Sequence, residues 1–313
     1  MPAAMPEREK ESPFGPYRPR REESPFGPRP ERKRARDPFA PPGAERETAA
    51  PARSRPPAPA RPLDLYVEVA PGGAAMGHVP RLPGLAFRAG DTEQLARVAR
   101  AKVSEYLRWL AAEHLADLTA TTAELEKLER IGYGDLIRIA ERERVEGAPL
   151  WISRQPAALF LVDRYALDDE DVAAIVRFTR QVLRRMRLAV AGLAPAERAW
   201  KPAPDRRSLD ETLTHVGDCT WWYASRIDDA LPEPAAVADE EPIDRAARLL
   251  ERAAEFLFSV PLSARTTIHV PARFFSADPS EAWTHAKVCR RLAEHAWEHL
   301  QGLARAVQMA VEA

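Results

Sequence analysis

Three histidines in the C-terminal half of the chain have the spacing of a metal site. His295 and His299 are four residues apart in a segment with helical periodicity, so their imidazoles project from one face of a helix, about one turn apart. His215 lies near the middle of an earlier predicted helix, and its ring completes a set of three nitrogens if the two helices are neighbours. Three histidine ligands leave a coordination position open, which is typical of catalytic rather than structural zinc sites.

The pair His295 and His299 also has a simpler interpretation, because two histidines at helical spacing often line a polar stripe. If the three rings do bind a divalent ion, with Zn²⁺ or Ni²⁺ the favoured candidates, the ion keeps its full positive charge, since imidazole is a neutral ligand. A bound water or thiol would then lose its proton near neutral pH and attack a small electrophile. The histidine spacing leaves both interpretations open.

Other polar residues near these histidines have weaker patterns. Cys219 follows His215 by four residues and could approach the ion, although an inert buried thiol is the simpler interpretation. Arg290 and Arg291 could bind an anionic substrate or a neighbouring carboxylate. Three acidic residues could accept hydrogen bonds from the ligand N–H groups or could simply be solvated. They are Asp218, Glu294 and Glu298.

The remaining histidines carry no pattern of a site. His78 and His114 stand alone, and His269 lies in a short strand-like run and is best interpreted as structural. His285 stands near the start of the last predicted helix, and we expect it to be a surface or capping residue.

Four amphipathic segments must position the three candidate ligands. They are predicted at 168–193, 208–230, 244–258 and 280–313. Ser208 is a good cap for the second segment, and Glu211 stands at the capping-box position. The pattern predicts a four-helix bundle over residues 168–313, with a strand-like excursion at 266–270 before its last helix.

A shorter segment before the helices has the pattern of a small sheet and one helix. Apolar residues alternate with polar ones from 63 to 69, and two further extended runs follow, the second ending at Phe87. Asp91 or Thr92 can then cap a helix. We expect a β-β-β-α module over 63–115 and then a bridge over 116–167. Helix can continue through 115–128, and the apolar residues at about 136–145 suggest a strand within the bridge. The fold class is therefore α+β and mainly α.

The first 62 residues differ in composition from the rest. They contain 16 of the 30 prolines and 14 Lys and Arg against 9 Asp and Glu, whereas the other 251 residues contain 32 against 38. Proline at this density removes amide donors, so we expect a disordered tail. The motif at 11–16 (ESPFGP) returns at 23–28, and 37–39 (DPF) repeats its centre. The copies are either short motifs for a partner or a low-complexity leader.

Composition also excludes several classes of protein. An acidic folded part makes nucleic-acid binding unlikely, since such domains usually carry a basic face. The chain has no uninterrupted apolar stretch of about 18 residues and begins without the apolar run of a secretory signal. The two cysteines form no CxxC pair. We therefore expect a cytoplasmic protein that does not enter a membrane.

Residues 206–215 (RRSLDETLTH), 221–223 (WWY) and 283–299 (WTHAKVCRRLAEHAWEH) together resemble the DinB-like family. The resemblance covers about residues 168–310. It implies an up-down-down-up four-helix bundle in which a second-helix histidine and a fourth-helix His-x-x-x-His pair bind a divalent metal, which assigns the ligand role to His215, His295 and His299. Members of this family include transferases that use low-molecular-weight thiols. The resemblance thus implies a metal-dependent transferase or hydrolase, with a thiol S-transferase acting on a small-molecule electrophile as the leading candidate.

Residues 78–92 (HVPRLPGLAFRAGDT) resemble the HicB-like domain, in which a P-x-L-P-G turn precedes G-D-T and a helix. The resemblance covers about residues 64–112. HicB antitoxins pair with small RNA-cleaving proteins and usually carry a DNA-binding segment, which has no counterpart in this sequence. An alternative function is that of a regulatory or interaction protein, in which the module and the tail bind protein partners and the bundle is a scaffold with or without a metal. The module also suggests a homodimer. Histidine rings that are closed off by packing or point apart would favour the scaffold.

Overall fold

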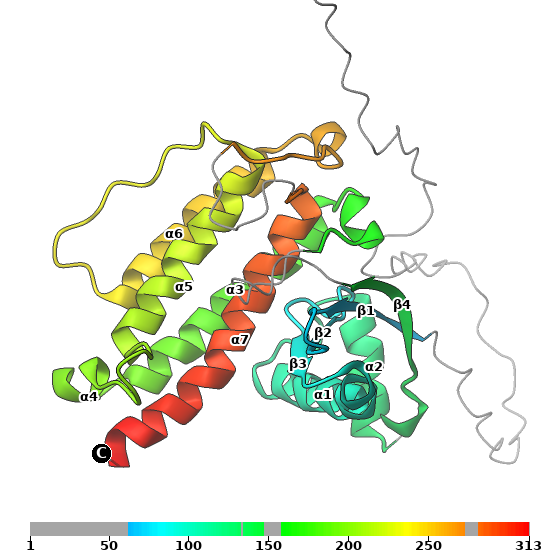
Figure 1. Ribbon diagram of the computed structural model, residues 1–313, viewed down its shortest axis with the longest axis horizontal. Helices are drawn as coiled ribbons and strands as arrows, with labels where there is room; N and C mark the ends of the chain where they lie inside the picture. Colours follow the sequence, from blue (N-terminus) through cyan, green and yellow to red (C-terminus); the bar gives the residue numbers. More distant parts are fainter. Residues whose placement is uncertain (1–61, 133, 147–157, 273–280, 313) are drawn as a thin grey trace, which may run out of the picture.

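The computed structural model describes residues 62–132, 134–146, 158–272 and 281–312. The tail predicted over 1–62 lies outside these residues, apart from Pro62. The fold is α+β and mainly helical, as predicted, with a small sheet and its two helices on one side of the long helix α7 and three other long helices on the opposite side (Figure 1). Within the described ranges, every helix is too short or too polar to cross a membrane.

The sheet has four strands in the order β3-β2-β1-β4. Strands β1 (Leu63–Val69), β2 (Ala75–His78) and β3 (Ala86–Ala89) form an antiparallel meander, and β4 (Ile139–Glu146) pairs in parallel with β1. A strand was predicted near this place, but as part of a bridge between domains and not as part of the sheet. Strand β4 lies at the edge of the sheet, and its five charged side chains suit this position, because they discourage other chains from pairing with the free edge.

Helix α1 packs on the sheet, and helix α2 packs on α1. Helix α1 (Thr92–Ala112) is capped by Asp91, whose carboxylate accepts a hydrogen bond of 2.6 Å from the backbone N–H of Gln94. The sequence predicted that helix could continue through 115–128, but the chain breaks at His114, which has a positive φ of 57°. Helix α2 (Ala120–Arg130) then starts anew, because Thr119 caps it.

The other side of the molecule consists of four long helices. They are α3 (Asp169–Val190), α5 (Leu209–Ala224), α6 (Pro242–Ser259) and α7 (His285–Glu312), with the short α4 (Pro195–Ala199) after α3. Helices α3 and α5 each pack against both α6 and α7. The connection 228–241 returns from the end of α5 to the start of α6, so these two helices run in the same direction (Figure 1).

Two predictions about this half were wrong in detail. The second helix ends at Ala224 and not near residue 230, because the chain tightens into a 3-10 turn at Ser225–Ile227. In the described part of the chain, the predicted strand at 266–270 is only an isolated bridge between His269 and Trp283.

Helix α7 is buried on all sides over much of its length. Every residue from His285 to Trp297 is buried, because α3 and α5 cover one side and the sheet module covers the other (Figure 1). This is unlike the one-sided burial that an amphipathic pattern predicts.

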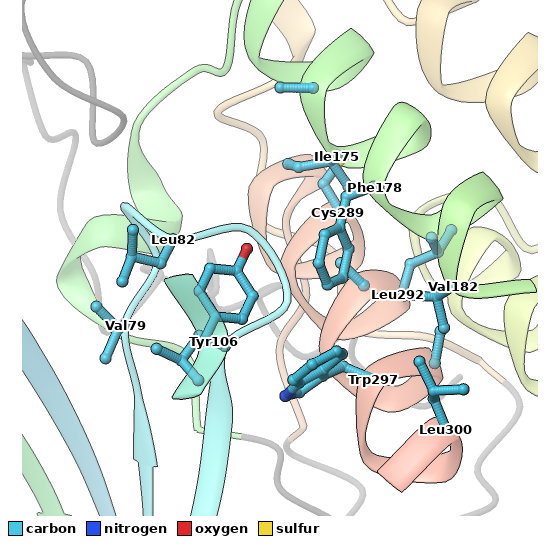
Figure 2. Packing of buried hydrophobic residues seen from close by; sticks show 14 of the residues in the cluster. Val79, Leu82, Tyr106, Ile175, Phe178, Val182, Cys289, Leu292, Trp297 and Leu300 are labelled. Carbon is cyan, nitrogen blue, oxygen red and sulfur yellow. The ribbon is translucent and has the colours of Figure 1, made fainter. Parts of the chain in front are cut away.

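Aromatic rings join the module to the helices. Tyr106 of α1 and Phe178 of α3 lie beside Trp297 of α7 (Figure 2), with ring centroids 5.5 Å and 6.0 Å from that of Trp297. The ring of Trp109, also on α1, is 4.7 Å from that of Trp297. Gly84 of the Pro-Gly turn has a positive φ of 82°, and a Cβ there would overlap the Phe178 ring. Only glycine therefore fits this turn. Buried residues of both halves form one continuous hydrophobic core.

Candidate metal centre

Helices α5 and α7 bring His215, His295 and His299 together. The Nε2 atom of His295 lies 3.3 Å from Nε2 of His215 and 3.1 Å from Nε2 of His299. One ligand atom from each ring lies within 4.8 Å of the other two. The three rings therefore converge on one point and do not point apart.

These distances fit a single small ion. Three nitrogens at 2.0–2.1 Å from a tetrahedral zinc would be about 3.3–3.4 Å from one another, close to the two measured separations. A single cation could bind the lone pairs of all three Nε2 atoms at once. Hydrogen bonds could join the same atoms only if some of the rings carry their proton on Nε2, because each neutral imidazole has one N–H.

Electrostatics keep the rings neutral. Burial is the main cause that lowers the pKa of His215 to about 4, and the neighbouring His299 and Arg207 add to the effect. Burial, Arg207 and Arg291 likewise lower the pKa of His299 to about 4. His295 is only 8% exposed, and its pKa is lowered well below the ordinary value for the same main reason. Neutral imidazoles are the form that binds metals.

Local sequence fixes the position of α5. Ser208 accepts a hydrogen bond from the backbone N–H of Glu211, and the Glu211 carboxylate accepts one from the N–H of Ser208, so the predicted capping box is confirmed. Gly217 then lets α5 approach α6, because a Cβ at this position would lie 3.0 Å from Cα of Ala246. This close contact sets the depth at which His215 faces α7.

Three side chains form the wall behind the rings. The Tyr223 ring packs 5.6 Å from the His295 ring, and the Tyr223 hydroxyl accepts a hydrogen bond of 3.4 Å from Arg291. Burial raises the pKa of Tyr223 to about 12, so its hydroxyl stays protonated at neutral pH. The sulfur of Cys219 lies 3.5 Å from Nδ1 of His215, and burial raises its pKa to about 11. With an ion on Nε2, the Nδ1 proton of His215 would have this sulfur as an acceptor.

The acidic residues that flank the histidines do not act as acceptors for the ligand rings. Asp218 pairs with Arg245 at 2.8 Å, and Glu298 pairs with Arg88 at 2.9 Å. Glu294 faces the sheet module, where its carboxylate contacts His78. Because each carboxylate has its own basic partner, the negative charge of these residues is neutralised away from the three rings.

A buried ionic cluster, which sequence analysis missed, joins α7 to the sheet. Its members are Glu68, His78, Asp163, Arg290 and Glu294. His78 lies 2.9 Å from Glu294 and 3.4 Å from Glu68, and Arg290 donates two hydrogen bonds of 2.7 and 2.8 Å to Asp163. Burial disfavours the charged imidazole, but the two glutamates outweigh it and raise the pKa of His78.

The structure decides between the two interpretations of the arginines and corrects the expectation for His285. Arg290 and Arg291 serve neighbouring carboxylates, as one of the two interpretations held. His78, which had no pattern, is the fully buried link between sheet and helix. The expectation for His285 was wrong in that the residue is buried, and its Nε2 lies 3.0 Å from the carbonyl oxygen of Leu257. A charged group in the chain sequence looks the same whether water or another charge is its partner.

Comparison with known proteins gives no assignment. No protein-family model matches the chain, and neither a curated protein nor a solved structure matches it.

Proposed function

We propose that the chain is a divalent-metal-dependent enzyme of the DinB-like type, in which His215, His295 and His299 bind the ion. The observation that carries this proposal is the convergence of three neutral ring nitrogens at the separations of a tetrahedral site. The all-nitrogen donor set favours zinc or nickel.

The arrangement of the helices supports the same proposal. In an up-down-down-up bundle the second and third helices are parallel and need a long connection, which the course of 228–241 provides (Figure 1). Contacts of α3 and α5 with both α6 and α7 are those of four helices around a common core. We assign the HicB-like module a supporting role, because its sheet holds α7 through the buried ionic cluster.

A bound divalent ion supplies Lewis acidity that lowers the pKa of a coordinated thiol or water. The protein residues hold the three imidazoles neutral by burial and close the back of the site with the Tyr223 ring. His215 and His299 are only half-buried, so a substrate reaches the site from their side.

The proposed reaction is transfer of a low-molecular-weight thiol to a small electrophile. The thiol sulfur forms a bond to an electrophilic carbon, the leaving group departs with its bonding electrons, and the thiol proton passes to solvent. Converging rings also weigh against the alternative, a scaffold without a metal, because that function requires no shared point for three nitrogens.

Metal analysis of the full chain tests the proposal. We compare the protein with the variants His299→Ala and His114→Asn. His114 is exposed and has a positive φ, which asparagine tolerates. Since losing even an outer partner of a ligand costs about 10–100-fold in metal affinity, His299→Ala should lose most of its metal and His114→Asn none. Equal metal content in the two variants would overturn the site.

The reaction is tested on the same preparation. Chelated and metal-reloaded protein are mixed with a low-molecular-weight thiol and monobromobimane, and thioether formation is followed by fluorescence. We expect the rate above background to vanish on chelation and return on reloading. A protein that binds the metal but gives no such difference with any thiol would retain the site and refute the transferase.

A further inference from the structure

A groove outside the metal centre has an apolar floor. It measures about 610 Å³ and lies between α6, the end of α5 and the connection 228–241. This size is within the range of about 300–1,000 Å³ that is typical of ligand sites. The apolar part of its lining consists of Trp221, Leu231, Pro232, Pro234, Ala235 and Phe256. The rings of Trp221 and Phe256 are half-buried, so each still presents a face for an occupant.

The connection that borders this groove is acidic. The connection 228–241 contains six Asp and Glu and no Lys or Arg. The two arginines of the lining already have partners, since Arg248 pairs with Glu240 at 2.6 Å and Arg252 with Glu255 at 2.9 Å. Glu233, which also lines the groove, is exposed and has no basic partner in the part of the chain that the structure describes. The rim therefore has negative charge left to bind a basic occupant.

The N-terminal part of the same chain contains a segment with the complementary chemistry. Residues 17–36 carry eight Lys and Arg against three Asp and Glu, and the motif Ser24-Pro25-Phe26-Gly27-Pro28 lies at the centre of these charges. Proline-rich segments bind grooves lined by aromatic residues in the extended polyproline II conformation, which has no internal hydrogen bonds. A phenylalanine between prolines offers such a groove one large apolar side chain.

We propose that the segment Tyr17–Arg36 docks in the groove between α6 and the connection 228–241 of its own molecule, with Phe26 on the rings of Trp221 and Phe256. The flanking arginines then lie along the acidic rim. This interaction surface is separate from the proposed metal centre, because the three histidines do not line the groove.

The length of the intervening chain permits this contact. Residues 29–61 separate the motif from the first described residue, and these 33 residues can span up to about 110 Å when extended. A folded part of 251 residues has a radius of gyration of about 18 Å, so the segment reaches any face. Tethering also gives the segment an effective concentration of about a millimolar, which favours it over a free partner of similar affinity.

Photo-cross-linking in the full chain tests the docking. A benzoylphenylalanine replaces Phe26, the protein is irradiated, and the attached peptides are identified by mass spectrometry. We expect attachment to peptides that contain Trp221, residues 231–235 or Phe256. Raising the salt from 0.05 M to 1 M should lower the yield, because the rim contacts are between exposed charges. Attachment mainly to other surfaces would overturn the proposal.

Matched variants distinguish binding in this groove from nonspecific attachment. Phe256→Ser and Glu233→Lys should each lower the yield about fivefold or more, a change of about 1 kcal/mol. Phe258→Ser is the control, since Phe258 is on the same helix, is 41% exposed and does not line the groove. Circular dichroism verifies that each variant is folded. If Phe256→Ser does not fold, Glu233→Lys still tests the docking, because residue 233 is exposed. Equal yields in Phe256→Ser and Phe258→Ser would refute the docking, as would cross-links between ¹⁵N-labelled and unlabelled copies in a mixed sample.

Discussion

At the scale of single residues, the three candidate ligands combine burial with neutrality. An isolated His-x-x-x-His pair has an ordinary structural interpretation, and the pattern of the sequence does not decide against it. The Nε2 separations of 3.1 and 3.3 Å add a geometric argument for a shared ion, because three nitrogens bound to one zinc ion lie about 3.3–3.4 Å apart.

Acid release of the metal should report the lowered pKa values of these rings. The pKa of both His215 and His299 is about 4, against 6.5 for an ordinary histidine. Protons therefore compete with the metal only well below pH 6.5. We expect the metal content to stay constant from pH 7 to about pH 5 and to fall as the pH approaches 4. Dialysis against buffers of graded pH, followed by elemental analysis, measures this, and half-release near pH 6.5 would show that the rings are not shielded.

The lowered pKa values of these rings also determine how the stability of the protein depends on pH. Because the folded pKa of His215 and His299 lies below the unfolded value, the unfolded chain binds more protons between about pH 4 and 6.5. The metal-free protein should thus lose stability as the pH falls through that interval, and circular dichroism of the dialysed samples distinguishes this unfolding from release by a folded protein.

At the scale of elements, the position of α5 depends on how closely it approaches α6. Ser208 and Glu211 could be identified as its start from the sequence alone, because capping is a local interaction. Gly217 could not be identified as a contact point, because in a sequence a glycine within a helix is only a weak helix former. Its role depends on Ala246, which is 29 residues away in the chain.

The variants Gly217→Ala and Gly302→Ala should therefore have opposite effects. Alanine in place of glycine stabilises a helix by about 0.5–1 kcal/mol when nothing obstructs it. At Gly302 of α7 no atom lies within 4 Å of the added Cβ, whereas at Gly217 the backbone of Ala246 is 3.0 Å away. We expect Gly302→Ala to raise the free energy of unfolding and Gly217→Ala to lower it by about 1–3 kcal/mol. Urea denaturation measures both, and a stabilised Gly217→Ala would contradict the close approach.

At the scale of the whole molecule, the sequence pattern could predict the class of fold and most helices but not the surroundings of α7. Apolar residues of its helical pattern, such as Val288 and Leu292, are buried. Glu294 was open to interpretation as solvated, because a charged residue has the same pattern whether water or other charges surround it. The sheet module covers this residue, and β4, predicted as part of a bridge, belongs to the same sheet. Both facts depend on contacts between distant segments, which periodicity does not report.

The link between the two halves should make Arg290 one of the most sensitive positions. Its guanidinium holds Asp163, whose side chain is 2% exposed, through two hydrogen bonds. Replacing Arg290 by methionine keeps much of the volume but leaves the Asp163 carboxylate buried without its cation, a change that costs about 3–5 kcal/mol. Arg180→Met is the matched control, because Arg180 pairs with Glu251 at the surface and is 53% exposed, where an ion pair contributes about 0–1 kcal/mol. Thermal unfolding compares the two variants, and equal losses would mean that the buried ionic cluster does not hold the sheet module on α7.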